Sequence, residues 1–154
     1  MELNYMGIYM SEVEMNNLMS WGSCKREFIR KVEVDLDRVE SIRKTALLRL
    51  SRARGTKVDG ENVSLIVEDY YEVIKELLVA YLLKSGMRSK NHQCLISYFA
   101  KENPDLEKES ILISQMSFFR NRLGYYGEMI PVKFYKEKKE DFERLVSILF
   151  ELIK

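Results

Sequence analysis

The feature that most constrains the fold is the helical spacing of apolar residues, and it is clearest from about Glu61 to Lys84. Apolar residues recur there every three or four positions, as they do on a buried helix face. One stripe contains Val63, Ile66, Tyr70, Ile74, Leu77 and Tyr81, and a second contains Tyr71, Leu78 and Leu82. A helix with two apolar stripes packs against neighbours on two sides. We therefore expect this helix to lie at the centre of a helical bundle.

The same spacing predicts further helices along the chain. They run from Ser23 to about Arg54, from an N-cap at Ser89 to about Glu102, from near Asp105 into the segment SFFRNRLGYYGE (117–128), and from about Lys136 to Ile153. No segment alternates apolar and polar residues as a half-buried strand would. The sequence predicts an all-α, up-and-down bundle of four to five helices, formed as one domain over residues 1–154. Residues 1–22 are expected to be an N-terminal arm or a short helix.

The charge balance and the cysteines limit the functional classes. Lys and Arg number 25 against 24 Asp and Glu, so the net charge of +1 produces no global basic field, and any nucleic-acid contact has to be local. Cys24 and Cys94 are far apart and match neither a disulfide framework nor a metal-binding CxxC pair, so we expect buried, reduced thiols. Without a secretory leader or a long apolar run, the chain is expected to be cytoplasmic and to have no membrane contact. We also expect no metal and no cofactor.

The segment SFFRNRLGYYGE carries the main candidate site. At helical spacing, one face holds Leu112, Met116, Phe119, Leu123 and Tyr126, and these should face the core. A second face holds Ser114, Ser117, Arg120, Asn121, Gly124 and Tyr125. The forked guanidinium of Arg120 suits a phosphate or a carboxylate, and Gly124 would leave room between Arg120 and Tyr125. The simpler alternative is that Arg120 pairs with a glutamate and that Gly124 is only a tolerated defect.

Two stretches together resemble the HEPN (higher eukaryotes and prokaryotes nucleotide-binding) family, in its single-domain archaeal and bacterial form. They are YYEVIKELLVAYLLKSGMRSKNHQCLI (70–96) and RNRLGYYG (120–127), and the resemblance extends over roughly residues 27–154. It implies a four- to five-helix bundle that forms a homodimer and binds a nucleotide or RNA. It also implies a possible small nucleotidyltransferase as partner, often in a toxin–antitoxin pair. Many members are metal-independent ribonucleases whose motif, Arg followed after four to six residues by His, meets its copy across the dimer.

This chain departs from that motif at the histidine. By position, Arg120 matches the family arginine, Asn121 matches the polar residue after it, and Tyr125 occupies the place of the histidine. A tyrosine with a pKa near 10 is a poor base at neutral pH, so binding should survive better than catalysis. The catalytic candidates are Arg120, Asn121 and Tyr125, and the binding candidates are Arg120, Arg122, Gly124, Ser117 and His92. His92, the only histidine, either replaces the missing base or caps and packs the start of its helix.

Two charged segments leave alternatives open. Asp69, Glu72 and Glu76 either pair with Arg120 or Arg122, or form a solvated face. The most basic stretch, RLSRARGTK (49–57), either contacts a phosphate backbone or offsets the dipole at a helix C-terminus. Three functions therefore remain: a nucleotide- or RNA-binding domain, a ribonuclease with tyrosine in place of the histidine, and a non-catalytic dimeric bundle that docks another protein.

Overall fold

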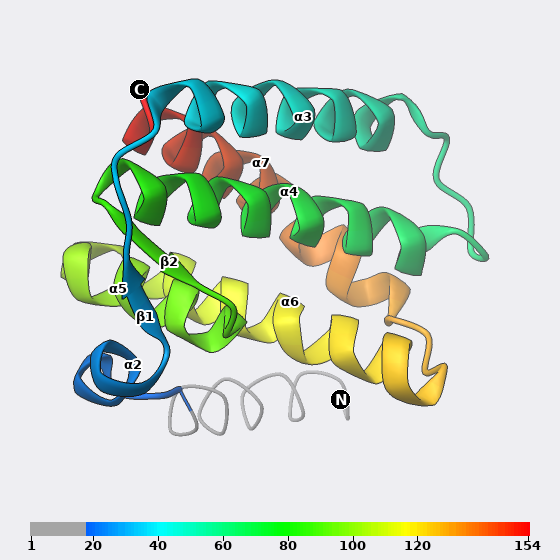
Figure 1. Ribbon diagram of the computed structural model, residues 1–154. Helices are drawn as coiled ribbons and strands as arrows, with labels where there is room; N and C mark the ends of the chain where they lie inside the picture. Colours follow the sequence, from blue (N-terminus) through cyan, green and yellow to red (C-terminus); the bar gives the residue numbers. More distant parts are fainter. Residues whose placement is uncertain (1–17) are drawn as a thin grey trace.

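A computed structural model describes residues 18–154 and shows that this part of the chain is mostly helical (Figure 1). Its elements are α2 (Trp21–Glu27), β1 (Ile29–Lys31), α3 (Leu36–Gly55), α4 (Val63–Lys84), β2 (Met87–Ser89), α5 (His92–Glu102), a 3-10 turn (Pro104–Leu106), α6 (Glu107–Tyr126) and α7 (Val132–Leu152). The predicted helical class is confirmed. The described residues form six α-helices rather than four to five. The expected arm falls mostly on residues 1–17, outside the described part, and α2 begins at Trp21.

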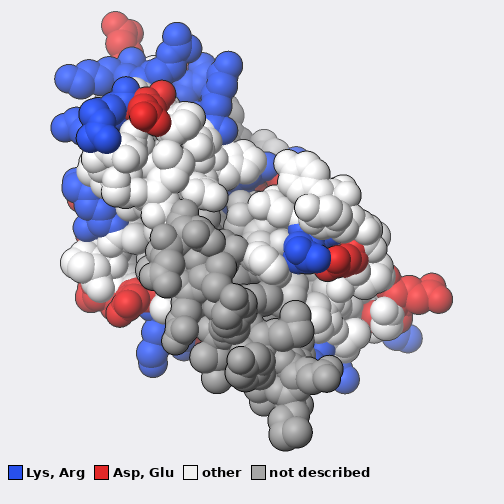
Figure 2. All heavy atoms as spheres, turned by 90° about the horizontal axis from the view of Figure 1, so that it is seen from below, with Lys and Arg blue, Asp and Glu red and all other residues white. Residues whose placement is uncertain are grey.

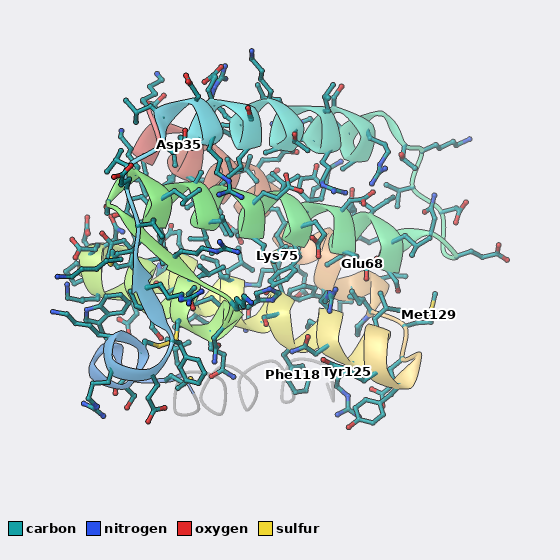
Figure 3. The ribbon with its side chains drawn as sticks, viewed as in Figure 1. Asp35, Glu68, Lys75, Phe118, Tyr125 and Met129 are labelled. Atoms are coloured by element: carbon teal, nitrogen blue, oxygen red, sulfur yellow. A yellow bond between two sulfur atoms is a disulfide. The ribbon has the colours of Figure 1, made fainter. Side chains whose placement is uncertain are left out.

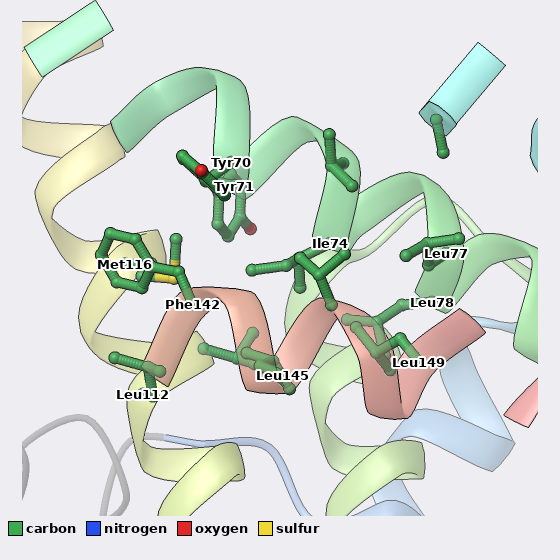
Figure 4. Close-up of a cluster of buried hydrophobic side chains, with 14 of the residues drawn as sticks. Tyr70, Tyr71, Ile74, Leu77, Leu78, Leu112, Met116, Phe142, Leu145 and Leu149 are labelled. Atoms are coloured by element: carbon green, nitrogen blue, oxygen red, sulfur yellow. The ribbon is translucent and has the colours of Figure 1, made fainter. Parts of the chain in front are cut away.

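The helix α4 is the centre of the fold, as its two apolar stripes predicted. It contacts α3, α5, α6 and α7. Figure 4 shows Tyr70, Ile74 and Leu78 of α4 among side chains of α6 and α7. The partners labelled there are Leu112 and Met116 from α6, and Phe142, Leu145 and Leu149 from α7. Each large apolar side chain that is fully buried contributes about 1.5–3 kcal/mol, so α4 organises most of the core.

The prediction of one long helix from Ser23 to Arg54 is wrong, because the structure forms α2, the strand β1 and α3 over these residues. The side chain of Asp35 caps a new helix by accepting the N–H of Arg38 at 2.9 Å. Ahead of that cap, β1 pairs antiparallel with β2, so the prediction that the chain contains no strand is also wrong. Phe28 and Leu36, whose apolar spacing was part of the pattern that predicted this helix, are exposed. The helical spacing continued by coincidence through KVEV (31–34), whose two valines favour extended backbone.

The turn between α4 and β2 depends on Gly86. Its φ of +74° lies in the left-handed region that favours glycine, and an added Cβ would lie 3.1 Å from the Val32 carbonyl oxygen. The Val32 N–H donates to the Gly86 carbonyl at 2.9 Å, so the two strands approach closely at this point. This pairing sets the register Ile29↔Ser89, Arg30↔Arg88 and Lys31↔Met87. Because Ser89 belongs to β2, α5 is capped by Asn91 and not by the predicted Ser89.

Two of the later helix boundaries also differ from the prediction. The 3-10 turn takes up Pro104–Leu106, so α6 begins at Glu107. The helix α7 begins at Val132, directly after Pro131, and not near Lys136. No helix within residues 18–154 is long and apolar enough to cross a membrane.

A disulfide joins Cys24 of α2 to Cys94 of α5, so the prediction of two free, reduced thiols is wrong. Both side chains are fully buried, and beside them the Trp21 ring packs on Tyr98 with centroids 5.2 Å apart. Spacing along the chain gave no sign of this bond, because the fold alone brings α2 against α5. Disulfides are uncommon in the cytosol, so the cysteines no longer support a cytoplasmic location, which stays a prediction.

Replacing both cysteines with alanine should lower the free energy of unfolding. The bond spans a sequence separation of 70 residues, and closing a loop of that length restricts the unfolded chain by about 4 kcal/mol. Urea unfolding of the wild type and of Cys24→Ala/Cys94→Ala would measure the difference, and addition of a thiol reductant should matter only for the wild type. Equal stability of the two proteins would contradict this role for the disulfide.

Candidate functional site

A hollow of about 490 Å³ lies between the start of α5 and one face of α6. Its α5 side is formed by Lys90, Asn91, His92 and Gln93. Its α6 side is formed by Ser114, Ser117, Phe118, Asn121, Arg122, Tyr125 and Tyr126. Five of the predicted site residues, His92, Ser117, Asn121, Arg122 and Tyr125, therefore line one space. Lys90, Asn91, Gln93, Phe118 and Tyr126 were not predicted, although Asn91 is readable from the sequence as a helix cap.

The helix α6 has one buried and one open side. Leu112 and Met116 are buried as predicted, and Phe119 and Leu123 are half-buried. Tyr126 was also predicted to face the core, but it is 69% exposed. The last turn of α6 extends past the packed core before the left-handed Gly127 ends the helix. Figure 3 shows Phe118 and Tyr125 projecting from α6 on the side away from α4.

Arg120 points toward α4 and does not line the hollow. Its Nη2 lies 3.8 Å from Oε1 of Glu72, too far for a hydrogen bond. Its Nε is buried and has no hydrogen-bond partner among the described residues. Glu72 in turn pairs more closely with Lys75, at 2.6 Å. The alternative that Arg120 pairs with a glutamate is therefore confirmed, but the pair leaves part of the guanidinium unsatisfied.

His92 lies on the hollow and within range of the charge of Arg120. It is the first residue of α5 and lines the hollow together with Asn121 and Tyr125. Its pKa is lowered from 6.5, first by partial desolvation of the ring and then by the positive charges of Lys75 and Arg120, while Glu72 opposes the shift. The imidazole is therefore mainly neutral at pH 7. The sequence placed His92 at a helix start but gave no measure of its distance from Asn121 and Tyr125.

Gly124 does not separate Arg120 from Tyr125 as predicted, and Arg122 is paired with a neighbouring carboxylate. An added Cβ at Gly124 would meet only Nη1 of Arg120, at an ordinary contact distance of 3.9 Å. Arg120 turns to α4 and Tyr125 to the hollow, so there is no narrow space between them for Gly124 to keep open. Arg122 donates two hydrogen bonds to Glu128, at 2.6 and 2.5 Å, and its guanidinium lies between the rings of Phe118 and Tyr126. The Arg122 guanidinium is therefore paired with a carboxylate that directly follows its own helix.

The arginines of the basic stretch 49–57 form ion pairs with carboxylates of α4 and α7. Arg52 donates to Asp69 at 2.7 Å, Arg49 donates to Glu76, and Arg54 reaches Glu143 of α7 at 2.5 Å. The carboxylates are partly buried, with 24% of the Asp69 side chain and 18% of the Glu76 side chain exposed. The alternative of a solvated acidic face is therefore wrong. The arginines of RLSRARGTK hold α3 on α4 and α7 through these ion pairs.

Comparisons with known proteins assign no family. No family model matches the chain, and no curated protein or solved structure matches it. Within residues 18–154, no group of three or more His, Cys, Asp or Glu side chains is arranged to hold a metal ion. Function is therefore inferred from the arrangement of His92, Arg120 and the residues of the hollow.

The pKa of His92 should respond to Glu72. Among the described residues, Glu72 is the anion that acts on the imidazole, and it raises the pKa against the two cations. Glu72→Gln should therefore lower the His92 pKa further, and Lys75→Gln should raise it. An NMR titration of the imidazole in each protein measures both shifts. A His92 pKa above 6.5 in the wild type, or a rise in Glu72→Gln, would contradict this electrostatic environment.

Proposed function

We propose that this chain is a HEPN-like nucleotide- or RNA-binding domain that acts as a dimer, without strong ribonuclease activity. The arrangement of His92 carries the proposal: it lies on the hollow with Asn121 and Tyr125 and close enough to Arg120 for that cation to affect its pKa. A phosphate accepts hydrogen bonds from guanidinium, amide and hydroxyl groups, and the cluster contains all three kinds of donor. The resemblance of residues 70–96 and 120–127 to HEPN proteins supports the same function and the up-and-down arrangement of the bundle.

The unsatisfied guanidinium of Arg120 supports an anionic ligand. A buried polar group without a hydrogen bond costs about 1–3 kcal/mol, and more when it is charged. The buried Nε of Arg120 is such a group, and the ion pair that Arg120 forms with Glu72 is long. A phosphate bound beside His92 would supply the missing acceptor if Arg120 turned from Glu72 toward the hollow, and the long ion pair with Glu72 opposes that turn only weakly. The neutral Ser117 and Asn121 side chains would then contact a sugar or a base in the hollow.

Dimerisation is supported by the apolar surface at the end of α6. Tyr125 is 77% exposed, Tyr126 69% and Met129 59%, so large apolar groups remain outside the core. A second copy packed on this end would cover Met129 and the sides of the tyrosine rings that face away from the hollow, and would bring two hollows together, as the HEPN resemblance implies. A small nucleotidyltransferase is the further partner that the resemblance proposes, and a toxin–antitoxin pair is the setting that it proposes for the two.

Sedimentation velocity at micromolar concentration should report a dimer. Tyr125→Ser/Tyr126→Ser should shift the population toward the monomer, because exposed aromatic rings contribute most to such interfaces. Tyr135→Phe provides a control, because it alters a buried tyrosine of α7 and leaves the exposed end of α6 unchanged. A wild-type protein that stays monomeric would contradict the proposed assembly.

Arg120→Lys should weaken the binding of AMP or of a short RNA although the positive charge is kept. Lysine cannot present the planar pair of donors that holds a phosphate bidentately, so a loss of about tenfold is expected. Arg52→Lys is the matched control, because Arg52 pairs with Asp69 and lies outside the hollow. Isothermal titration would measure all three proteins. Equal affinities for the wild type and Arg120→Lys would remove Arg120 from the site.

A ribonuclease remains the second candidate, and the position of His92 favours it. A neutral imidazole on the same hollow as Tyr125 is suited to accept a 2′-hydroxyl proton, and general acid–base catalysis contributes about 10²–10⁴-fold. Our proposal predicts feeble cleavage of RNA by the metal-free wild type and a gain in Tyr125→His that requires Arg120. Robust wild-type cleavage that is lost in His92→Ala or in Tyr125→Phe would instead establish the ribonuclease.

A further inference from the structure

Six cations lie on α2, on the two strands and directly after β2, at one side of the molecule. They are Lys25, Arg26, Arg30, Lys31, Arg88 and Lys90, and we call them the ribbon patch. Every one of these residues is exposed. Figure 2, which views the molecule from below, shows blue side chains crowded along the upper left of that face, on the side where α2 and the strands lie in Figure 1. The patch cannot be recognised from the sequence, because its members come from two segments more than 50 residues apart.

The ribbon patch is not neutralised by the described part of the protein. Segments 21–31 and 87–90 contain one acid, Glu27, against the six cations, in a chain whose net charge is only +1. None of the six forms an ion pair with a described residue, and Arg26 reaches only the Ser23 hydroxyl, at 3.4 Å. By contrast, Arg49, Arg52 and Arg54 of α3 all have carboxylate partners. The two groups of cations therefore have different roles.

Arg30 and Arg88 face each other directly across the two strands. Like charges at directly opposed positions of an antiparallel pair destabilise the pair. The close approach of Gly86 to Val32 fixes the register, so the strands cannot slip to separate the two arginines. An anion bound between them would remove the repulsion. The pairing of the two strands does not by itself explain why both opposed positions carry an arginine.

We propose that the ribbon patch binds the phosphate backbone of a single-stranded RNA and leads it into the hollow. Lys90 belongs to both, since it follows β2 directly and lines the hollow beside His92. The exposed rings of Tyr125 and Tyr126 at the opposite rim provide surfaces on which unpaired bases stack. A basic track that ends at aromatic rings is the pattern of single-strand binding. This inference rests on the proposed function, because it assumes that the hollow receives a nucleotide.

The test compares Arg30→Gln/Arg88→Gln with a charge-matched control. Arg38→Gln/Lys44→Gln removes the same two charges from exposed positions of α3, neither of which forms an ion pair with a described residue. Fluorescence anisotropy of the full chain, with its disulfide intact, would use a mixed-sequence single-stranded RNA of about 12 nucleotides. The patch variant should bind about tenfold more weakly, and its log K against log salt slope should fall by about 1.4. The control should bind as the wild type does. The melting temperature of the patch variant should not fall, because a like-charge pair has been removed.

Binding of AMP in the same proteins separates the two proposals. AMP is too short to reach from the hollow along the strands, so both double variants should bind it as the wild type does. If the patch variant and the control bind RNA equally while AMP still binds, the ribbon patch is not an RNA surface and the proposed function stands. If the wild type binds neither RNA nor AMP, the proposed function fails and this inference fails with it. Binding to phosphatidylserine vesicles in place of RNA, lost in the patch variant, would overturn the inference in favour of a membrane surface.

Discussion

The burial of α4 on several sides is the constraint on which the remaining structure depends. Its apolar stripes hold α6 and α7 through Ile74, Leu78 and their partners, and its polar edge holds α3 through ion pairs. The C-terminal end of α4 then sets the site, because Gly86 turns the chain into β2 and β2 delivers His92 at the start of α5. The disulfide ties α5 to α2. The disulfide therefore fixes the position of α5, which forms one wall of the hollow.

The charges of the molecule are divided into satisfied and unsatisfied groups. On α3, α4 and α7, arginines and carboxylates pair closely, and even the buried Tyr70 hydroxyl donates to Glu143, a contact that together with burial raises the tyrosine pKa. On α2 and the strands, the cations have no such partners among the described residues. Arg120 lies between these extremes, with one long ion pair and a buried Nε that has no acceptor there. This division places the candidate anion site where the net charge of the whole chain gave no indication of one.

Local spacing in the sequence predicts part of the fold, and the prediction fails where distant segments decide the outcome. The two stripes of α4 specify a central helix because burial on two sides requires them. Local spacing does not show that residues 29–31 form a strand, since the segment with which they pair lies at 87–89. The disulfide and the ribbon patch are missed for the same reason. Within the site, the helical spacing gathered Ser117, Asn121 and Tyr125 on one face, but the direction of Arg120 depended on Glu72 of another helix.

The central claim is that a nucleotide phosphate binds beside His92 and Arg120, at the junction of the hollow and the ribbon patch. Its most direct measurement is an NMR titration of the isotopically labelled chain with a short single-stranded RNA. The account predicts that the backbone amides that shift lie in residues 87–93 and 114–126 and in β1, and that the imidazole signals of His92 shift with them. Shifts confined to α3 and the neighbouring face of α7, or no shifts at all, would contradict it.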